Sequence, residues 1–130
     1  IPALVRKMAE AVDVGSPTVE VWGSGSPMRE FLHVDDLADA LIFLMKRYSS
    51  AEHINVGSGE EISIGELAEN IAAMVGFSGK IVHDTSKPDG TPRKLMDSSR
   101  LQQLGWRARI GLDEGLASCV REYQASLIKE

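Results

Sequence analysis

Residues 63–76 read SIGELAENIAAMVG and form the most clearly delimited helix pattern of the chain. Ser63 and Glu66 have the spacing of a capping box, in which each side chain bonds the backbone N–H of the other residue. Gly76 suits the left-handed turn that ends a helix. The apolar face consists of Ile64, Leu67, Ala68, Ile71, Ala72 and Val75. An amphipathic helix of this kind must pack against another apolar layer.

Strand-like and helix-like stretches alternate along the rest of the chain. The predicted strands are Thr18–Trp22, Glu30–Val34, His53–Val56 and Lys80–His83. The other predicted helices begin at Pro2, at Asp35 or Asp36, at Asp97 or Ser98, and at Leu112. Such alternation is typical of an α/β fold. The pattern leaves open whether the chain is one domain or pieces of two.

Two of these helices carry apolar stripes that need a partner. In the helix after Asp36, the stripe is Leu37, Leu41, Leu44 and Met45. In the last helix it is Leu112, Leu116, Cys119, Val120, Tyr123 and Leu127. We therefore expect Cys119 to be buried and to act as a small apolar residue. Capping by Asp35 or Asp36 explains these adjacent carboxylates without an acid–base role.

Composition excludes several classes of protein. The chain has 130 residues, of which 43% are hydrophobic and 25% charged, as in a globular domain with its own core. A net charge of −5 argues against binding to nucleic acid or to an anionic membrane surface. One cysteine cannot form an internal disulfide, and three histidines without a nearby cysteine predict no metal site. We expect a cytoplasmic location. The start at Ile1 indicates a fragment.

Two loops have residues suited to a phosphate-bearing ligand. The loop Gly23–Ser26 exposes backbone N–H groups, but it lacks the spacing of a P-loop or dinucleotide fingerprint, so a plain turn between two strands is the favoured explanation. Arg29 follows it with a guanidinium that can bind a diphosphate or a carboxylate, or form a surface salt bridge. The loop Lys87–Lys94 combines three cations, one carboxylate and two prolines. It is either a lid over a polar ligand or a solvated loop.

The motifs of catalysis are missing from the sequence. We find no Gly-x-Gly-x-x-Gly after a strand, no Tyr-x-x-x-Lys pair and no nucleophile beside a base. We therefore predict no catalytic, cofactor-binding or metal-binding residue within the chain.

Three segments resemble a known family. The run Val21–Asp36, VWGSGSPMREFLHVDD, is similar to a signature of extended short-chain dehydrogenase/reductases that act on nucleotide sugars. The segments His53–Gly59 and Ser86–Leu95, HINVGSG and SKPDGTPRKL, resemble the GDP-L-fucose synthase family. The likeness continues through Arg100–Trp106. One departure is the segment Lys46–Glu52, which is often longer in the family.

The resemblance implies a fold and an activity. The fold is α/β, the C-terminal substrate-binding part of an extended short-chain dehydrogenase/reductase, with or without the last strand–helix–strand of the Rossmann domain. Residues 1–130 would form a GDP-sugar-binding portion, in which about residues 30–57 pack with the Rossmann domain. The family converts GDP-4-keto-6-deoxy-D-mannose to GDP-L-fucose by 3,5-epimerisation and reduction with NADPH. Its catalytic groups and most of its NADP site would lie upstream of Ile1, so the chain alone would be inactive.

The resemblance also assigns substrate contacts to Lys7, Trp22, Arg29 and Asp89. Lys7 and Arg29 would offset phosphate charge, Trp22 would form a flat apolar wall, and Asp89 would accept hydrogen bonds. The full-length family member would be a homodimer. The alternatives are another nucleotide-sugar epimerase or dehydratase, against which the Lys87–Lys94 loop argues, and a non-catalytic binding module with the same fold.

Overall fold

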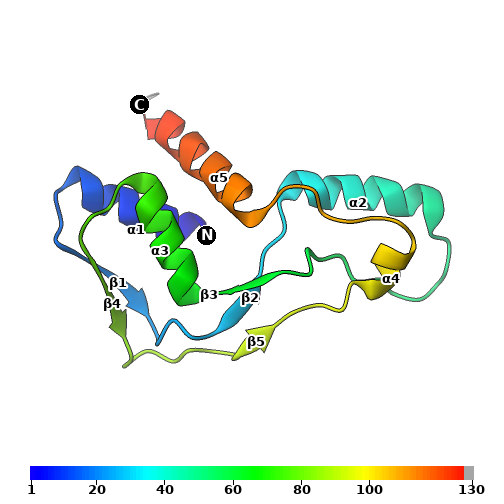
Figure 1. The fold of residues 1–130 in the computed structure, drawn as a ribbon, viewed down its shortest axis with the longest axis horizontal. Coiled ribbons are helices and arrows are strands. Elements are labelled where there is room, and N and C mark those ends of the chain that lie inside the picture. Colours follow the sequence, from blue (N-terminus) through cyan, green and yellow to red (C-terminus); the bar gives the residue numbers. More distant parts are fainter. Residues whose placement is uncertain (128–130) are drawn as a thin grey trace.

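The computed structural model describes residues 1–127, which form an elongated α/β structure with helices packed at both ends (Figure 1). In chain order the elements are α1 (Pro2–Asp13), β1 (Thr18–Trp22), β2 (Met28–Glu30), α2 (Val34–Arg47), β3 (Glu61–Ser63), α3 (Ile64–Val75), β4 (Lys80–Asp84), β5 (Arg93–Lys94), α4 (Ser99–Gln103) and α5 (Leu112–Leu127). The predicted α/β alternation is therefore confirmed. Among residues 1–127, no helix has the length and apolar content needed to cross a membrane.

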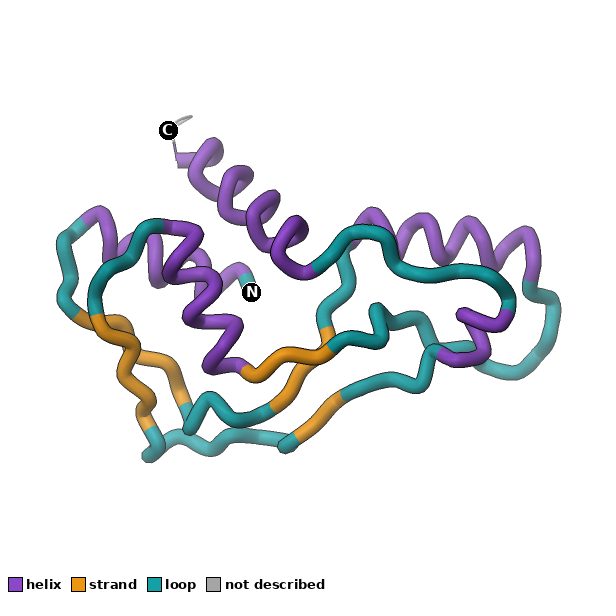
Figure 2. Tube along the Cα trace, in the orientation of Figure 1, coloured by secondary structure: helices purple, strands orange, loops and turns teal. Residues whose placement is uncertain are grey.

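The strands form two small sheets, which Figure 2 shows in orange. In the first sheet, β1 and β4 pair in parallel, with Thr18 opposite Lys80 and Trp22 opposite Asp84. In the second, β2 lies between β3 and β5, antiparallel to β3 and parallel to β5. Because β1 and β4 run in the same direction, the loops that follow them leave from the same edge of the sheet.

The main core lies where α1, α3 and α5 pack together beside the β1–β4 pair. Along β1, Val19 and Val21 are buried while Thr18, Glu20 and Trp22 are exposed, as the period of a strand requires. The buried residues of the main core are Val5, Met8, Ala11, Val19, Val21, Leu67, Ala68, Ile71, Ala72, Val75, Phe77, Leu116 and Val120. The apolar layer that the α3 pattern required is thus α1, α5 and the first sheet.

Helix α3 has the ends that its sequence predicts. The Ser63 hydroxyl oxygen accepts the Glu66 N–H at 3.1 Å, and the Glu66 carboxylate accepts the Ser63 N–H at 3.1 Å. Gly76 has φ +78° and closes the helix in the left-handed conformation. Both the predicted capping box and the predicted C-cap are confirmed.

A small cluster at the other end joins α2 to the segment before α5. Its buried residues are Ala40, Leu101 and Trp106. Asp36 is only 2% exposed, and its carboxylate accepts the N–H groups of Arg109 at 3.0 Å and Ile110 at 2.8 Å. Asp39 accepts the indole N–H of Trp106 at 2.8 Å. Two carboxylates of α2 therefore hold residues 106–110 in place.

Two predicted strands are wrong. In place of the predicted strand Glu30–Val34, β2 spans Met28–Glu30, residues 31–33 form no strand, and α2 begins at Val34. Residues 53–56 form no strand, since a strand needs a hydrogen-bonded neighbour and the described part of the chain supplies none. Instead, the Asn55 side-chain amide donates to the Asp97 carbonyl at 3.1 Å.

Two side-chain predictions are also wrong. The cap of α2 is neither Asp35 nor Asp36 but His33, whose Nδ1 accepts the Asp35 N–H at 3.2 Å. This leaves the Asp36 carboxylate available for residues 109 and 110. Cys119 is exposed, because α5 buries Leu116 and Val120 in the main core and turns the intervening Cys119 outward.

The buried Asp36 carboxylate yields a stability prediction. We expect Asp36→Ala to lower the free energy of unfolding by about 1–3 kcal/mol, because the N–H groups of Arg109 and Ile110 lose the carboxylate that accepts from them. Urea denaturation would measure the change. Asp35→Ala is the matched control, since the Asp35 side chain is 79% exposed. Equal effects of the two substitutions would contradict the role given to Asp36.

The α3 capping box yields a pH prediction. Hydrogen bonds from the hydroxyl and N–H of Ser63 hold the pKa of Glu66 below its ordinary value. A lowered folded pKa means that this contribution to stability is present above the unfolded pKa and is lost as pH falls through the folded one. NMR titration should show the Glu66 pKa rising toward its ordinary value in Ser63→Ala. In Ser49→Ala, which changes an exposed serine, it should stay low.

Candidate functional site

The candidate site lies where β1 and β4 end. Trp22 is the last residue of β1 and Asp84 the last of β4, and they are opposite each other. The loops 23–27 and 85–92 leave from this edge. The carboxyl ends of parallel strands are where α/β proteins commonly bind ligands.

Three backbone hydrogen bonds fix the loop 23–27, one to the end of β4 and two to the start of α3. The Gly23 N–H donates to the Asp84 carbonyl at 2.9 Å, and the Gly65 N–H donates to the Gly25 carbonyl at 2.8 Å. The Ile64 N–H donates to the Pro27 carbonyl at 3.0 Å. The start of α3 therefore supports the loop from below, and its backbone conformation is set before any ligand binds.

Trp22 presents an open aromatic surface. It is 65% exposed, unlike Trp106, which is 5% exposed. The Lys87 ammonium lies 5.6 Å from the centre of a Trp22 ring, within the range of a cation–π contact. Loop 85–92 thus places a positive charge against a flat apolar ring.

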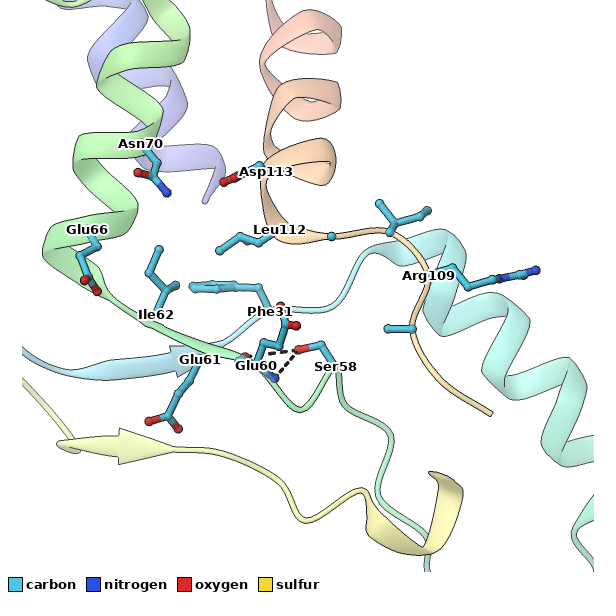
Figure 3. A pocket seen from close by; sticks show the side chains of 13 residues that line it. Phe31, Ser58, Glu60, Glu61, Ile62, Glu66, Asn70, Arg109, Leu112 and Asp113 are labelled. Carbon is cyan, nitrogen blue, oxygen red and sulfur yellow. Dashed lines mark hydrogen bonds between the residues drawn. The ribbon is translucent and has the colours of Figure 1, made fainter. Parts of the chain in front are cut away.

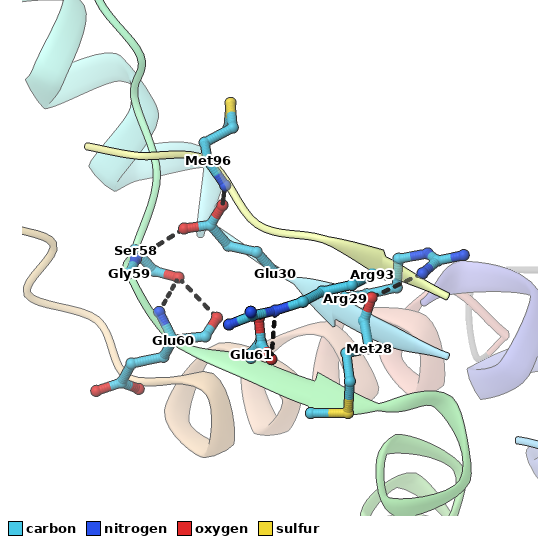
Figure 4. Close-up of polar contacts among 9 residues, drawn as sticks. All are labelled: Met28, Arg29, Glu30, Ser58, Gly59, Glu60, Glu61, Arg93 and Met96. Atoms are coloured by element: carbon cyan, nitrogen blue, oxygen red, sulfur yellow. Dashed lines mark hydrogen bonds and ion pairs between the residues drawn. The ribbon is translucent and has the colours of Figure 1, made fainter. Parts of the chain in front are cut away.

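Arg29 lies on β2 and is half-buried. Its Nη1 donates to the Met28 carbonyl at 2.7 Å (Figure 4). A methyl group added to Gly90 would lie 3.9 Å from Nη2, so the guanidinium reaches the loop 85–92.

Asp89 is exposed, but its carboxylate is occupied. Oδ1 accepts the Ser24 N–H at 2.5 Å and Oδ2 accepts the Ser24 hydroxyl at 2.8 Å. Residue 24 is 65 positions earlier in the chain, so this contact joins the two loops of the site.

Lys7 is set slightly apart from the other predicted residues. It is an exposed residue of α1, and its ammonium donates to the Glu20 carbonyl at 2.8 Å. Glu20 precedes Trp22 by two residues on β1. The structure therefore places Trp22 and Arg29 next to the loop 85–92, which contains Asp89. Lys7 contacts β1 closer to the middle of the strand.

The second sheet is held by carboxylates that sequence reasoning did not identify (Figure 4). Glu30 accepts the Gly59 N–H at 2.7 Å and the Met96 N–H at 3.1 Å through its two oxygens. Arg93 on β5 donates from Nε to both oxygens of Glu61 on β3, at 3.0 and 2.8 Å. These bonds fix β5, and with it one end of the loop 85–92.

A cavity of about 550 Å³ lies elsewhere, between the start of α5 and the β3–α3 segment (Figure 3). Phe31, Ile62 and Leu112 form its apolar part. None of the four predicted substrate contacts lines it. Glu66 at its edge is engaged in the α3 capping box. The cavity therefore does not coincide with the predicted site.

The chemistry of the site is that of binding. Lys7, Arg29 and Lys87 supply positive charge, and Trp22 supplies a flat ring, a combination suited to a phosphate group joined to a planar one. In residues 1–127, no group of three or more His, Cys, Asp or Glu side chains is arranged to hold a metal ion. Ser24 and Lys87 are the contributions that sequence analysis missed as individual residues, although it had singled out both of their loops.

Comparison with known proteins first shows which class of protein the chain resembles. Residues 1–57 match the model of the NAD dependent epimerase/dehydratase family. A GDP-L-fucose synthetase from Naegleria fowleri, solved with NADP bound, superposes with a TM-score of 0.90 at 30% identity over 98% of this chain and 40% of that chain. The predicted resemblance to extended short-chain dehydrogenase/reductases is confirmed.

Sequence relatives then show which group within this class the chain is most similar to among those compared. The chain is 58% identical over 128 residues to probable GDP-L-fucose synthase 1 of Oryza sativa subsp. japonica, covering 98% of this chain and 39% of the relative. It is 54% identical over 127 residues to GDP-L-fucose synthase of Escherichia coli, covering 91% of this chain and 40% of the relative. The chain is thus homologous to segments of GDP-L-fucose synthases and spans about two fifths of their length.

Proposed function

We propose that this chain forms the substrate-binding portion of an NADP-dependent GDP-L-fucose synthase, which converts GDP-4-keto-6-deoxy-D-mannose to GDP-L-fucose. The observation that carries the proposal is 58% identity, over 98% of the chain, to a rice protein named probable GDP-L-fucose synthase 1. NADPH supplies the hydride for reduction of the C4 keto group. In the proposal, NADP binds mainly to residues outside 1–130. The groups that perform epimerisation also lie outside this range.

We propose that Lys7, Trp22, Arg29 and Asp89 contact the GDP-sugar. Arg29 is the best-supported diphosphate ligand because its guanidinium projects from a strand and reaches the loop beside Gly90. Trp22 forms the wall of the site, and Lys7 adds charge next to β1. Asp89 belongs to the same loop, and its carboxylate retains unused lone pairs after accepting two hydrogen bonds from Ser24.

We also propose that α2 packs against the cofactor-binding part of the enzyme. One face of α2 is apolar and exposed, with Val34 at 69%, Leu41 at 52% and Met45 at 85% exposure. This α2 stripe consists of Val34, Leu37, Ala38, Leu41, Ile42 and Met45. The opposite face carries Asp36 and Ala40, which contact the segment before α5. A helix that is buried on one side and apolar but exposed on the other is suited to lie between two layers.

The function can be tested with a chimera in which this chain replaces the matched segment of the E. coli GDP-L-fucose synthase. We expect NADPH oxidation that depends on GDP-4-keto-6-deoxy-D-mannose. Arg29→Ala should raise the KM for the GDP-sugar roughly 10- to 100-fold, because the substrate loses a hydrogen bond to a charged group. The KM for NADPH should stay unchanged.

Arg6→Ala is the matched control for Arg29→Ala. Arg6 is an exposed arginine of α1 whose ion pair is with Glu10 of the same helix. Its substitution should leave both KM values unchanged. An active chimera in which the two arginine variants behave alike would remove Arg29 from the site.

The α2 stripe makes a separate prediction about the 130-residue chain in solution. Exposed apolar stripes drive association, so we expect its sedimentation coefficient to rise with concentration. Leu41→Glu combined with Met45→Glu should suppress the rise. Val14→Glu should not, because Val14 is 78% exposed but lies outside the stripe. A native chain that stays monomeric at every concentration would contradict the proposed packing.

A homodimeric state of the complete enzyme remains a prediction from the family resemblance. Light scattering on the complete enzyme would test it.

A further inference from the structure

The contact between Ser24 and Asp89 is more than a surface hydrogen bond. The Asp89 carboxylate receives both the N–H and the hydroxyl of Ser24, at 2.5 and 2.8 Å. The Ser24 hydroxyl oxygen also accepts the Ser26 N–H at 3.1 Å. Ser24 therefore presents two donors to one carboxylate from a loop that is itself internally bonded.

The loop that carries Ser24 is a fixed support. Gly23 and Gly25 have φ values of +82° and +79°, which favour glycine. A side chain at Gly23 would collide with the Asp89 carboxylate, and one at Gly25 would collide with the His83 ring. The loop approaches Asp89 at Gly23 and His83 of β4 at Gly25 so closely that only glycine fits at these positions.

The middle of the opposite loop has no comparable support. Its flanks are held, since the Lys87 N–H donates to the Asp84 carbonyl at 3.2 Å and the Met28 N–H donates to the Pro92 carbonyl at 2.8 Å. Within residues 1–127, the hydrogen bonds of residues 88–91 are those that Asp89 accepts from Ser24. The position of this segment depends on Ser24.

We propose that Ser24 is a positioning residue of the site, which acts through Asp89 to hold residues 88–91 against the end of β1. Held in this way, residues 88–91 keep Gly90 beside the Arg29 guanidinium, next in the chain to Lys87, whose ammonium lies over Trp22. A site whose charged and flat groups are in place before the ligand arrives loses less entropy on binding. The Ser24–Asp89 contact stands by itself, and its effect on GDP-sugar binding rests on the proposed function.

The contact can be tested in the 130-residue chain without any activity, by ¹⁵N relaxation of the backbone amides of Asp89, Gly90 and Thr91. We expect order parameters of about 0.85 in the native chain and a fall to about 0.6 or lower in Ser24→Ala and Asp89→Ala. Ser24→Thr, which keeps the hydroxyl, should restore the native values.

Ser118→Ala is the matched control for this experiment. Its hydroxyl donates to the Glu122 carboxylate at 3.4 Å on α5, away from the two loops, so the substitution removes the same kind of bond elsewhere. The order parameters of residues 89–91 should not change. Native order parameters in Ser24→Ala would overturn the proposal.

The consequence for binding is read in the chimera with the E. coli enzyme. Ser24→Ala should raise the KM for the GDP-sugar roughly tenfold, with kcat and the KM for NADPH unchanged, and Ser24→Thr should restore it. A loosened loop with an unchanged KM would overturn the positioning role. An inactive parent chimera would instead count against the proposed function, while the order parameters still decide the Ser24–Asp89 contact.

Discussion

The carboxylate of Glu30 is the contact on which the arrangement of the second sheet depends. Strands β3 and β5 contain three and two residues, too few for backbone pairing alone to fix them. Glu30 ends β2 and bonds the N–H groups of Gly59 and Met96, which lie 29 and 66 positions away along the chain. One side chain therefore closes two long loops. The Glu30 carboxylate also fills the space beside Gly57, so a side chain at residue 57 would collide with it.

The candidate site inherits its geometry from this sheet and from the β1–β4 pair. Loop 85–92 leaves β4 at Asp84 and joins β5 at Arg93, so each sheet fixes one end of it. Arg29 is adjacent to Glu30 and shares its fixed backbone, whereas Trp22 belongs to the first sheet. The site thus spans two sheets that have separate hydrogen-bond ladders, and the contact between Ser24 and Asp89 connects the loops that face each other across it.

Local signals were reliable where the physics is local. The α3 capping box and its Gly76 C-cap involve neighbours within one helical turn, so their spacing in the sequence was sufficient. Strands β1 and β4 were also predicted, because alternation of buried and exposed residues is a property of the strand itself. The family resemblance, carried by contiguous motifs, supplied the proposed contacts Lys7, Trp22, Arg29 and Asp89, which stay predictions. Local signals failed at His53–Val56, where strand formation depends on a neighbour, and at Cys119, where helical spacing alone placed the residue on the wrong face of α5.

By itself, the sequence determined the α/β class, the elements α3, β1 and β4, and the two loops that contain the candidate site, because these depend on the order and spacing of residues. Only the tertiary structure decided which side chains meet: His33 and not an aspartate caps α2, Asp36 is buried against residues 109 and 110, and Ser24 holds Asp89. Each of the last two contacts joins residues more than sixty positions apart. Such pairs are selected by packing and by the need to satisfy buried or converging polar groups, which no local spacing records.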